Sequence, residues 1–178
     1  MRVLMILIPE GGPPDGGDSF VRLERALGPY YAFRDADVEV VLASSEGGSP
    51  SIRNLSDSHA STEIMKRFRH DQSTVDEFAD TLSLDQVYTE DFDAAFCVGL
   101  PDSIWRPEHE GSAGALISRL LDAGKPVAVL PSGVNLAPNG AGDGLLIVGD
   151  SSKSPIPAAQ ALMAAVRQTH PKSKGNAT

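Results

Sequence analysis

A thiol and a hydroxyl are the side chains of this sequence best suited to nucleophilic chemistry. Cys97 lies inside the apolar segment Phe96–Val98, and a buried thiol has a raised pKa and packs as a small hydrophobic group. We therefore predict a core residue rather than a reactive one.

Ser132 follows the apolar run Val127–Leu130, where a strand-to-helix turn can present a hydroxyl. A G-x-S-x-G elbow requires glycine at positions 130 and 134, which hold leucine and valine. The sequence thus favours a turn residue over a nucleophile.

Loop carboxylates form a second set of candidates, next to glycines 11, 12, 16 and 17. This loop matches neither G-x-G-x-x-G nor G-x-x-x-x-G-K-[ST], so it does not predict a phosphate site. Glu10, Asp15 and Asp18 also place negative charge where a phosphate would lie. We interpret the loop as solvated. A weaker hypothesis is a divalent-cation or small-ligand pocket that uses these three carboxylates and Asp102, because hard cations prefer several oxygen ligands.

Histidine patterning argues against a metal centre. The sequence has four histidines, and no pair has the close helical spacing of metal ligands. Glu108, His109 and Glu110 are adjacent, and adjacent residues seldom converge on one ion. His170, which is the only histidine after Ser132, borders the polar end of the chain and does not predict a catalytic base for it. We expect no metal and no cofactor.

The elements that would position these residues follow from apolar patterning. Short apolar runs bounded by Gly, Pro, Asp or Ser are typical of strands buried on both faces of a parallel sheet. They span Val3–Ile8, Val38–Ala43, Ala94–Val98, Val127–Leu130 and Leu145–Val148. Apolar residues at helical spacing lie between and after them, in Phe20–Phe33, Ile64–Phe68, Val75–Leu82, Leu116–Leu121 and Ala158–Val166. Predicted helix starts are Asp18 or Ser19 for the first, Ser73 or Thr74 for the third, and Pro155 with Pro157 for the last.

This alternation predicts an open α/β sheet in a single domain over residues 1–170, followed by a flexible tail at 171–178. In such sheets, ligands bind beyond the carboxyl ends of the strands, near the point where strand order reverses. The loops to inspect are therefore residues 9–18, 99–107 and 131–135.

Composition and charge limit the classes of protein to which this chain can belong. The 178 residues carry a formal net charge of −9 with a pI of about 4.8, which disfavours binding to nucleic acid or to anionic lipid. The run Met1–Ile8 is shorter than the ~20 residues of a membrane-spanning helix and lacks a signal-peptide cleavage site. With one cysteine, no intramolecular disulfide can form. We expect a cytoplasmic globular protein.

Several motifs, in order along the chain, resemble the ThiJ/PfpI superfamily, which is class I glutamine amidotransferase-like. Pro29–Ala36 with Glu39–Ser44 is similar to the family stretch PYYAF-DAG-EV-LASP. Asp91–Phe96 resembles DYDAVF, and Gly124–Val129 resembles GKPVAAV. Asp143–Gly149 is similar to DGNLITG. The resemblance covers nearly the whole chain and implies a flavodoxin-like open, mostly parallel sheet with helices on both faces. It also implies a homodimer, since dimers are common in the family.

Active members of this family use a cysteine after a central strand, a neighbouring histidine, a glutamate of the first helix and a Gly-Gly oxyanion loop. The cysteine position here holds Pro131, and the histidine position holds Ser132. The glutamate position falls on Arg25, with Glu24 beside it. The oxyanion loop reads Gly99, Leu100, Pro101, Asp102. The resemblance therefore implies no catalytic residue, and a vestigial pocket formed by Glu10, Glu24, Arg25, Gly99, Leu100, Pro131 and Ser132.

Two functional hypotheses follow. The first is a non-catalytic protein that binds an unidentified small molecule or acts as a scaffold. The second is a hydrolase-like, glyoxalase-like or peptidase-like enzyme with replacement residues, which uses Ser132 with Glu24 or Glu10, or uses Cys97. Loss of the nucleophile, base, acid and oxyanion loop together favours the first hypothesis.

Overall fold

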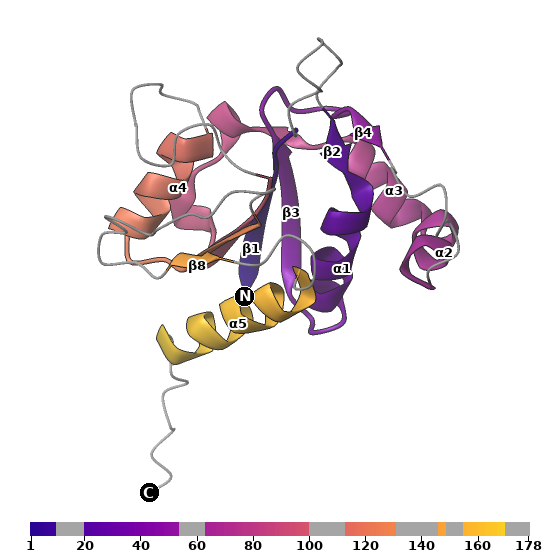
Figure 1. Cartoon of the computed structure of the whole chain (residues 1–178). Helices are drawn as coiled ribbons and strands as arrows, with labels where there is room; N and C mark the ends of the chain where they lie inside the picture. Colours follow the sequence, from indigo (N-terminus) through magenta and orange to yellow (C-terminus); the bar gives the residue numbers. More distant parts are fainter. Residues whose placement is uncertain (10–19, 54–62, 100–112, 131–145, 149–154, 170–178) are drawn as a thin grey trace, which may run out of the picture.

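The protein is built on a parallel sheet with the strand order β5-β3-β1-β6-β7-β8 (Figure 1). The computed structural model describes residues 1–9, 20–53, 63–99, 113–130, 146–148 and 155–169. Its six strands are β1 (Arg2–Leu7), β3 (Glu39–Ser44), β5 (Leu82–Ser83), β6 (Ala94–Val98), β7 (Val127–Leu130) and β8 (Leu146–Val148). Every neighbouring pair in this sheet is parallel. The predicted flavodoxin-like fold class is confirmed.

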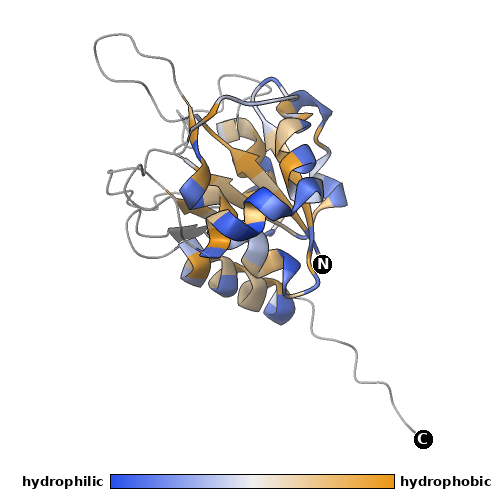
Figure 2. Cartoon of the chain, turned by 90° about the vertical axis from the view of Figure 1, so that its right-hand side faces the viewer, coloured by the Kyte–Doolittle hydropathy of each residue, from blue (hydrophilic) through white to orange (hydrophobic). Residues whose placement is uncertain are grey.

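The central strands β1, from Val3 onwards, and β6 are apolar and buried because both faces of the sheet are covered. On β1, Val3, Met5 and Leu7 join one core cluster, whereas Leu4 and Ile6 join the other. The first cluster lies under α1 (Leu23–Arg34) and α5 (Pro155–Thr169), and the second lies under α4 (Ala113–Asp122). Figure 2 shows hydrophobic strands behind helices that carry both hydrophobic and hydrophilic residues.

A pair of short helices packs beside α1. Helices α2 (Glu63–His70) and α3 (Gln72–Ala79) follow one another and dock on the tyrosines of α1. The rings of Tyr30 and Phe78 meet edge to face with centroids 5.3 Å apart, and the Tyr30 hydroxyl donates to Glu77 at 2.7 Å. Two 3-10 turns, η1 (Leu84–Gln86) and η2 (Thr89–Asp91), then lead to β6.

The starts of α1 and α3 differ from those predicted. The N-cap position of α1 is Arg22, which makes no side-chain capping hydrogen bond, rather than Asp18 or Ser19, because Val21–Arg22 forms β2 and pairs with β4 (Ile52–Arg53). Such two-residue strands carry no periodicity that a sequence reveals.

The predicted cap of the third helix, Ser73 or Thr74, is also wrong. Asp71 is the N-cap of α3, and its carboxylate accepts from the Thr74 backbone N–H at 3.2 Å and from the Thr74 hydroxyl at 2.8 Å. Leu82, the last residue of the helix predicted over Val75–Leu82, lies in β5. The start of α5 at Pro155 is as predicted. Among the described helices, none is both long enough and apolar enough to cross a membrane.

Candidate functional site at the carboxyl edge of the sheet

The strand order places the ligand crevice at the ends of β1 and β6. The chain leaves β1 towards β3 on one side and leaves β6 towards β7 on the other, so strand order reverses between these two neighbours. Ile8 and Gly99 directly follow the two strands. The Ile8 N–H donates to the Val98 carbonyl at 2.9 Å, and the Gly99 N–H donates to the Leu130 carbonyl at 3.2 Å. Backbone hydrogen bonds thus join the ends of β1, β6 and β7 into one edge.

Gly99 is required at this edge by close packing. Its φ is +101°, and a Cβ placed on it would lie 2.6 Å from the Ile8 carbonyl oxygen. No other residue fits this approach of two main chains without a shift of the backbone. Gly99, which was predicted as part of a vestigial pocket, lies at the reversal point.

Arg25 lies in the first turn of α1 and extends to the same edge. Its side chain is buried, and its Nη2 donates to the Leu130 carbonyl at 3.0 Å. That carbonyl, with two lone pairs, accepts from both Gly99 and Arg25. Leu130 is the last residue of β7 and precedes Pro131, the position at which the resemblance predicts the family cysteine.

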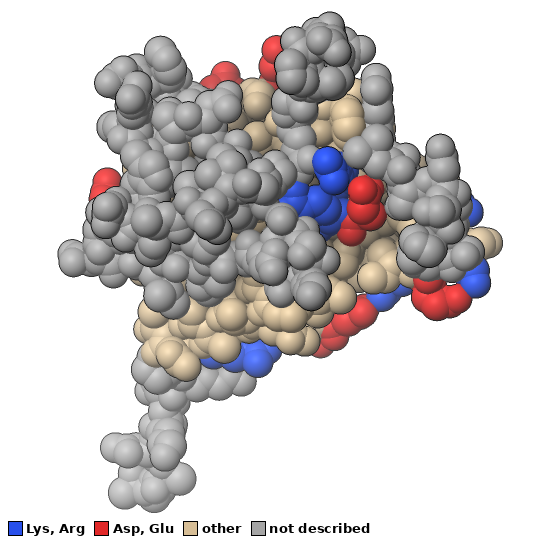
Figure 3. Space-filling model, viewed as in Figure 1, with Lys and Arg blue, Asp and Glu red and all other residues tan. Residues whose placement is uncertain are grey.

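Glu24 adds a carboxylate to the first turn of α1. It is partly buried, and its Oε2 is inaccessible to solvent with no hydrogen-bond partner among the described residues. Figure 3 shows basic and acidic side chains next to one another over β2 and the start of α1. A buried acceptor without a hydrogen bond costs free energy. This oxygen is therefore a candidate acceptor for an N–H or O–H group of a ligand.

Cys97 is a core residue, as predicted. It is fully buried in β6 and belongs to the cluster under α4. Burial raises the pKa of its thiol far above the ordinary value, and the positive charge of Arg25 only partly opposes this. Its Sγ lies 3.7 Å from the Gly99 carbonyl. A protonated, inaccessible thiol is a poor nucleophile.

The remaining predicted site residues lie outside the described part of the chain: Glu10, Leu100, Pro131 and Ser132, together with the proposed cation ligands Asp15, Asp18 and Asp102. Among the described residues, no group of three or more His, Cys, Asp or Glu side chains could hold a metal ion. His70 lies on α2 with its Nδ1 2.7 Å from the Lys66 carbonyl, away from the sheet edge.

The fold is identified by its similarity to solved structures. A glyoxalase III from Candida albicans superposes with a TM-score of 0.59 at 16% identity, over 92% of this chain and 96% of its own. A ThiJ/PfpI domain protein from Brachyspira murdochii gives a TM-score of 0.54 at 12% identity, over 94% and 96%. The chain has the ThiJ/PfpI fold. A further structure, whose name states no activity, gives a TM-score of 0.66 at 17% identity, over 94% and 98%. No family model and no curated protein matches the chain.

The structure also reveals features that sequence reasoning missed. The contact between Arg25 and Leu130 joins residues 105 positions apart, and no local pattern encodes such a contact. A serine-rich loop after β3 lines a groove at the same edge of the sheet. The sequence signal for that loop is the run Ser44–Ser51, with two adjacent glycines and four serines.

Proposed function

We propose that this protein is a ThiJ/PfpI superfamily member that binds a small molecule or acts as a scaffold, without the thiol chemistry of active members. One observation carries the proposal. The Arg25 guanidinium, at the position where the resemblance implies a glutamate, donates to the carbonyl that precedes the nucleophile position. An arginine side chain has donors only and stays charged, so it cannot accept a proton as a carboxylate can.

The thiol of the chain supports the same proposal. Pro131 offers no nucleophile, and Cys97 is buried with a raised thiol pKa. Nucleophilic catalysis requires an accessible, activated thiolate. The first turn of α1 carries a guanidinium that binds a main-chain carbonyl and a partly buried carboxylate, which suit recognition of a polar ligand better than transfer of a proton.

The test is turnover of methylglyoxal by the purified protein, with Candida albicans glyoxalase III as the positive control. We expect lactate formation equal to that of heat-denatured protein. The Cys97→Ala variant should be indistinguishable from wild type. Turnover that Cys97→Ala or Arg25→Gln abolishes would overturn the proposal, because it would place catalysis at this edge.

A second candidate function is an enzyme with replacement residues, such as a hydrolase-like, glyoxalase-like or peptidase-like protein. The buried Glu24 Oε2 favours it, because a carboxylate without a described partner can accept a proton. Ser132 would then be the nucleophile. Hydrolysis of p-nitrophenyl acetate that both Ser132→Ala and Glu24→Gln remove, but Glu90→Gln leaves intact, would favour this function. Equal rates in all four proteins would exclude it.

The proposal includes a cytoplasmic location and a homodimer. The single cysteine, buried and unpaired with another thiol, is compatible with a reducing compartment. Sedimentation equilibrium tests the oligomeric state, and a mass equal to one chain would exclude the homodimer.

A further inference from the structure

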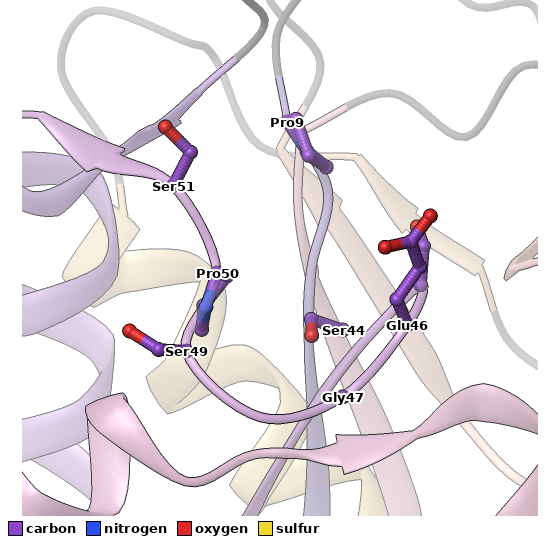
Figure 4. Close-up of a pocket in the computed structure, with 8 residues that line it drawn as sticks. Pro9, Ser44, Glu46, Gly47, Ser49, Pro50 and Ser51 are labelled. Atoms are coloured by element: carbon purple, nitrogen blue, oxygen red, sulfur yellow. The ribbon is translucent and has the colours of Figure 1, made fainter.

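A groove of about 370 Å³ opens where β1 and β3 end (Figure 4). Pro9 forms one wall, and the loop after β3 forms the rest, with Ser44, Glu46, Gly47, Pro50 and three further serines. This volume lies in the range of small-molecule sites, ~300–1,000 Å³. The groove has its own lining residues, which include neither Arg25 nor Glu24.

The main chain of this loop is held in place before any ligand arrives. Gly48 and Thr81 exchange two backbone hydrogen bonds of 2.8 Å, and the Val21 N–H donates to the Ser51 carbonyl at 2.7 Å. Gly47 has a φ of +75°, and a Cβ on it would lie 2.8 Å from the Ser83 nitrogen. The loop is therefore fixed against β5 in the middle and against β2 at its end. A preformed wall lowers the ordering cost of binding.

Two hydroxyl groups in series make Ser44 Oγ, at the floor of the groove, a hydrogen-bond acceptor for a ligand. Thr81 Oγ1 donates its one proton to the Gly48 carbonyl at 2.9 Å. In the 2.7 Å contact between Thr81 and Ser44, the proton must then come from Ser44 Oγ. Ser44 is buried, and its hydroxyl has lone pairs left but no proton to offer. A ligand that meets Ser44 must bring an N–H or O–H donor.

The charge of the groove determines which donor ligands it favours. Glu46 forms no ion pair with a described residue, and the described residues that line the groove include no Lys, Arg or His. In Figure 4 the hydroxyls of Ser49 and Ser51 point to the outside of the loop, so the wall there is Pro50 and main chain. The groove combines acceptors and one negative charge with two proline rings, which favours a cationic donor on an apolar body.

We propose that this groove binds a small organic ammonium ion, with its N–H groups on Ser44 Oγ and the Glu46 carboxylate and its apolar part against Pro9 and Pro50. The inference goes beyond the proposed function and stands whether or not the Arg25 edge is catalytic. Neutral alcohols and carboxylates of the same shape bind less well, since the first lacks the charge and the second meets Glu46 with like charge.

The experiment is a titration of ¹⁵N-labelled protein with three probes of one shape: benzylamine, benzyl alcohol and benzoate. Benzylamine should give saturable amide shifts in residues 44–51, with a Kd at least about fivefold lower than that of benzyl alcohol, as expected for one exposed charge pair. Benzoate should leave these amides unshifted. Amide spectra of every variant also report whether it is folded.

Matched variants identify the contacts. Glu46→Gln should weaken benzylamine about fivefold and leave benzyl alcohol unchanged, whereas Glu90→Gln, an exposed residue elsewhere with the same change in net charge, should affect neither. Ser44→Ala should weaken benzylamine about tenfold relative to Ser73→Ala, through loss of a hydrogen bond to a charged group. Equal binding of the amine and the alcohol, tighter binding of benzoate, shifts located elsewhere, or no shifts with any probe would overturn the proposal.

Discussion

Arg25 is a buried charged residue whose contact links α1 to the end of β7. The family resemblance predicts that it occupies the glutamate position of active members, and this stays a prediction. The contact itself could not be predicted, because it depends on how α1 packs against the end of β7. A buried guanidinium needs such an acceptor, since leaving its donors unpaired would cost free energy.

Changing Arg25 tests this contact. Arg25→Glu should lower the free energy of unfolding by about 3 kcal/mol, because a carboxylate would face the Leu130 carbonyl in a buried position. Arg25→Gln, a shorter and neutral side chain, should cost only about 1 kcal/mol, since it buries no charge and the Leu130 carbonyl still accepts from the Gly99 N–H. Chemical denaturation of both variants measures the difference. Equal losses would show that the side chain does not face this carbonyl.

The thiol of Cys97 gives a pH-dependent prediction. Its folded pKa is raised by burial, so the folded state keeps its proton while the unfolded thiol ionises near pH 8.5. Stability must therefore fall as pH rises above that value, by about 2 kcal/mol between pH 8 and pH 10. Cys97→Ala should lack this component when its unfolding is measured over the same range. Parallel profiles for the two proteins would contradict the buried position.

At the scale of elements, the sequence predicted the strands that are buried on both faces. β1 from Val3 onwards, β6 and β7 are continuous apolar runs because helices cover the sheet on each side. The strands β2, β4 and β5 have two residues each. Their existence depends on pairing between distant segments, and this is why the predicted cap of α1 was wrong.

Alanine substitutions at two glycines test how closely the ends of β1 and β6 are packed. Gly99→Ala should destabilise the protein by about 3 kcal/mol, because φ is +101° and the new Cβ would meet the Ile8 carbonyl. Gly124→Ala is the control: its φ is +70°, but no atom lies within 4 Å of the added Cβ. It should cost only about 1 kcal/mol, the backbone term alone. Thermal and urea unfolding will show whether Gly99 is the more sensitive position.

The docking of α3 on α1 depends on a buried tyrosine. Burial and the Glu77 carboxylate raise the pKa of Tyr30 to about 12, so its hydroxyl stays protonated and donates to Glu77 at all ordinary pH values. Tyr30→Phe should cost about 1 kcal/mol. The exposed Tyr88→Phe should cost nothing measurable. If both variants unfold at the wild-type urea concentration, this hydrogen bond does not stabilise the helix pair.

For the whole molecule, the sequence predicted the open parallel sheet and the edge at which a site should lie. That inference needed only strand order, because carboxyl ends of parallel strands meet at one edge. The groove beside Pro9 was missed, since its floor depends on the hydroxyl chain from Ser44 to Thr81 and Gly48, which spans distant segments. Glu10, Leu100, Pro131 and Ser132 lie outside the described residues, and their roles stay predictions.

We propose that this fold has kept its architecture without acid–base catalysis at the sheet edge. The most direct test is kcat/KM of the wild-type protein for methylglyoxal, measured from about pH 5 to about pH 9 beside Candida albicans glyoxalase III. We predict a value equal to the heat-denatured background at every pH. A bell-shaped profile above background would contradict the claim, because it requires a titrating acid and base that act on the substrate.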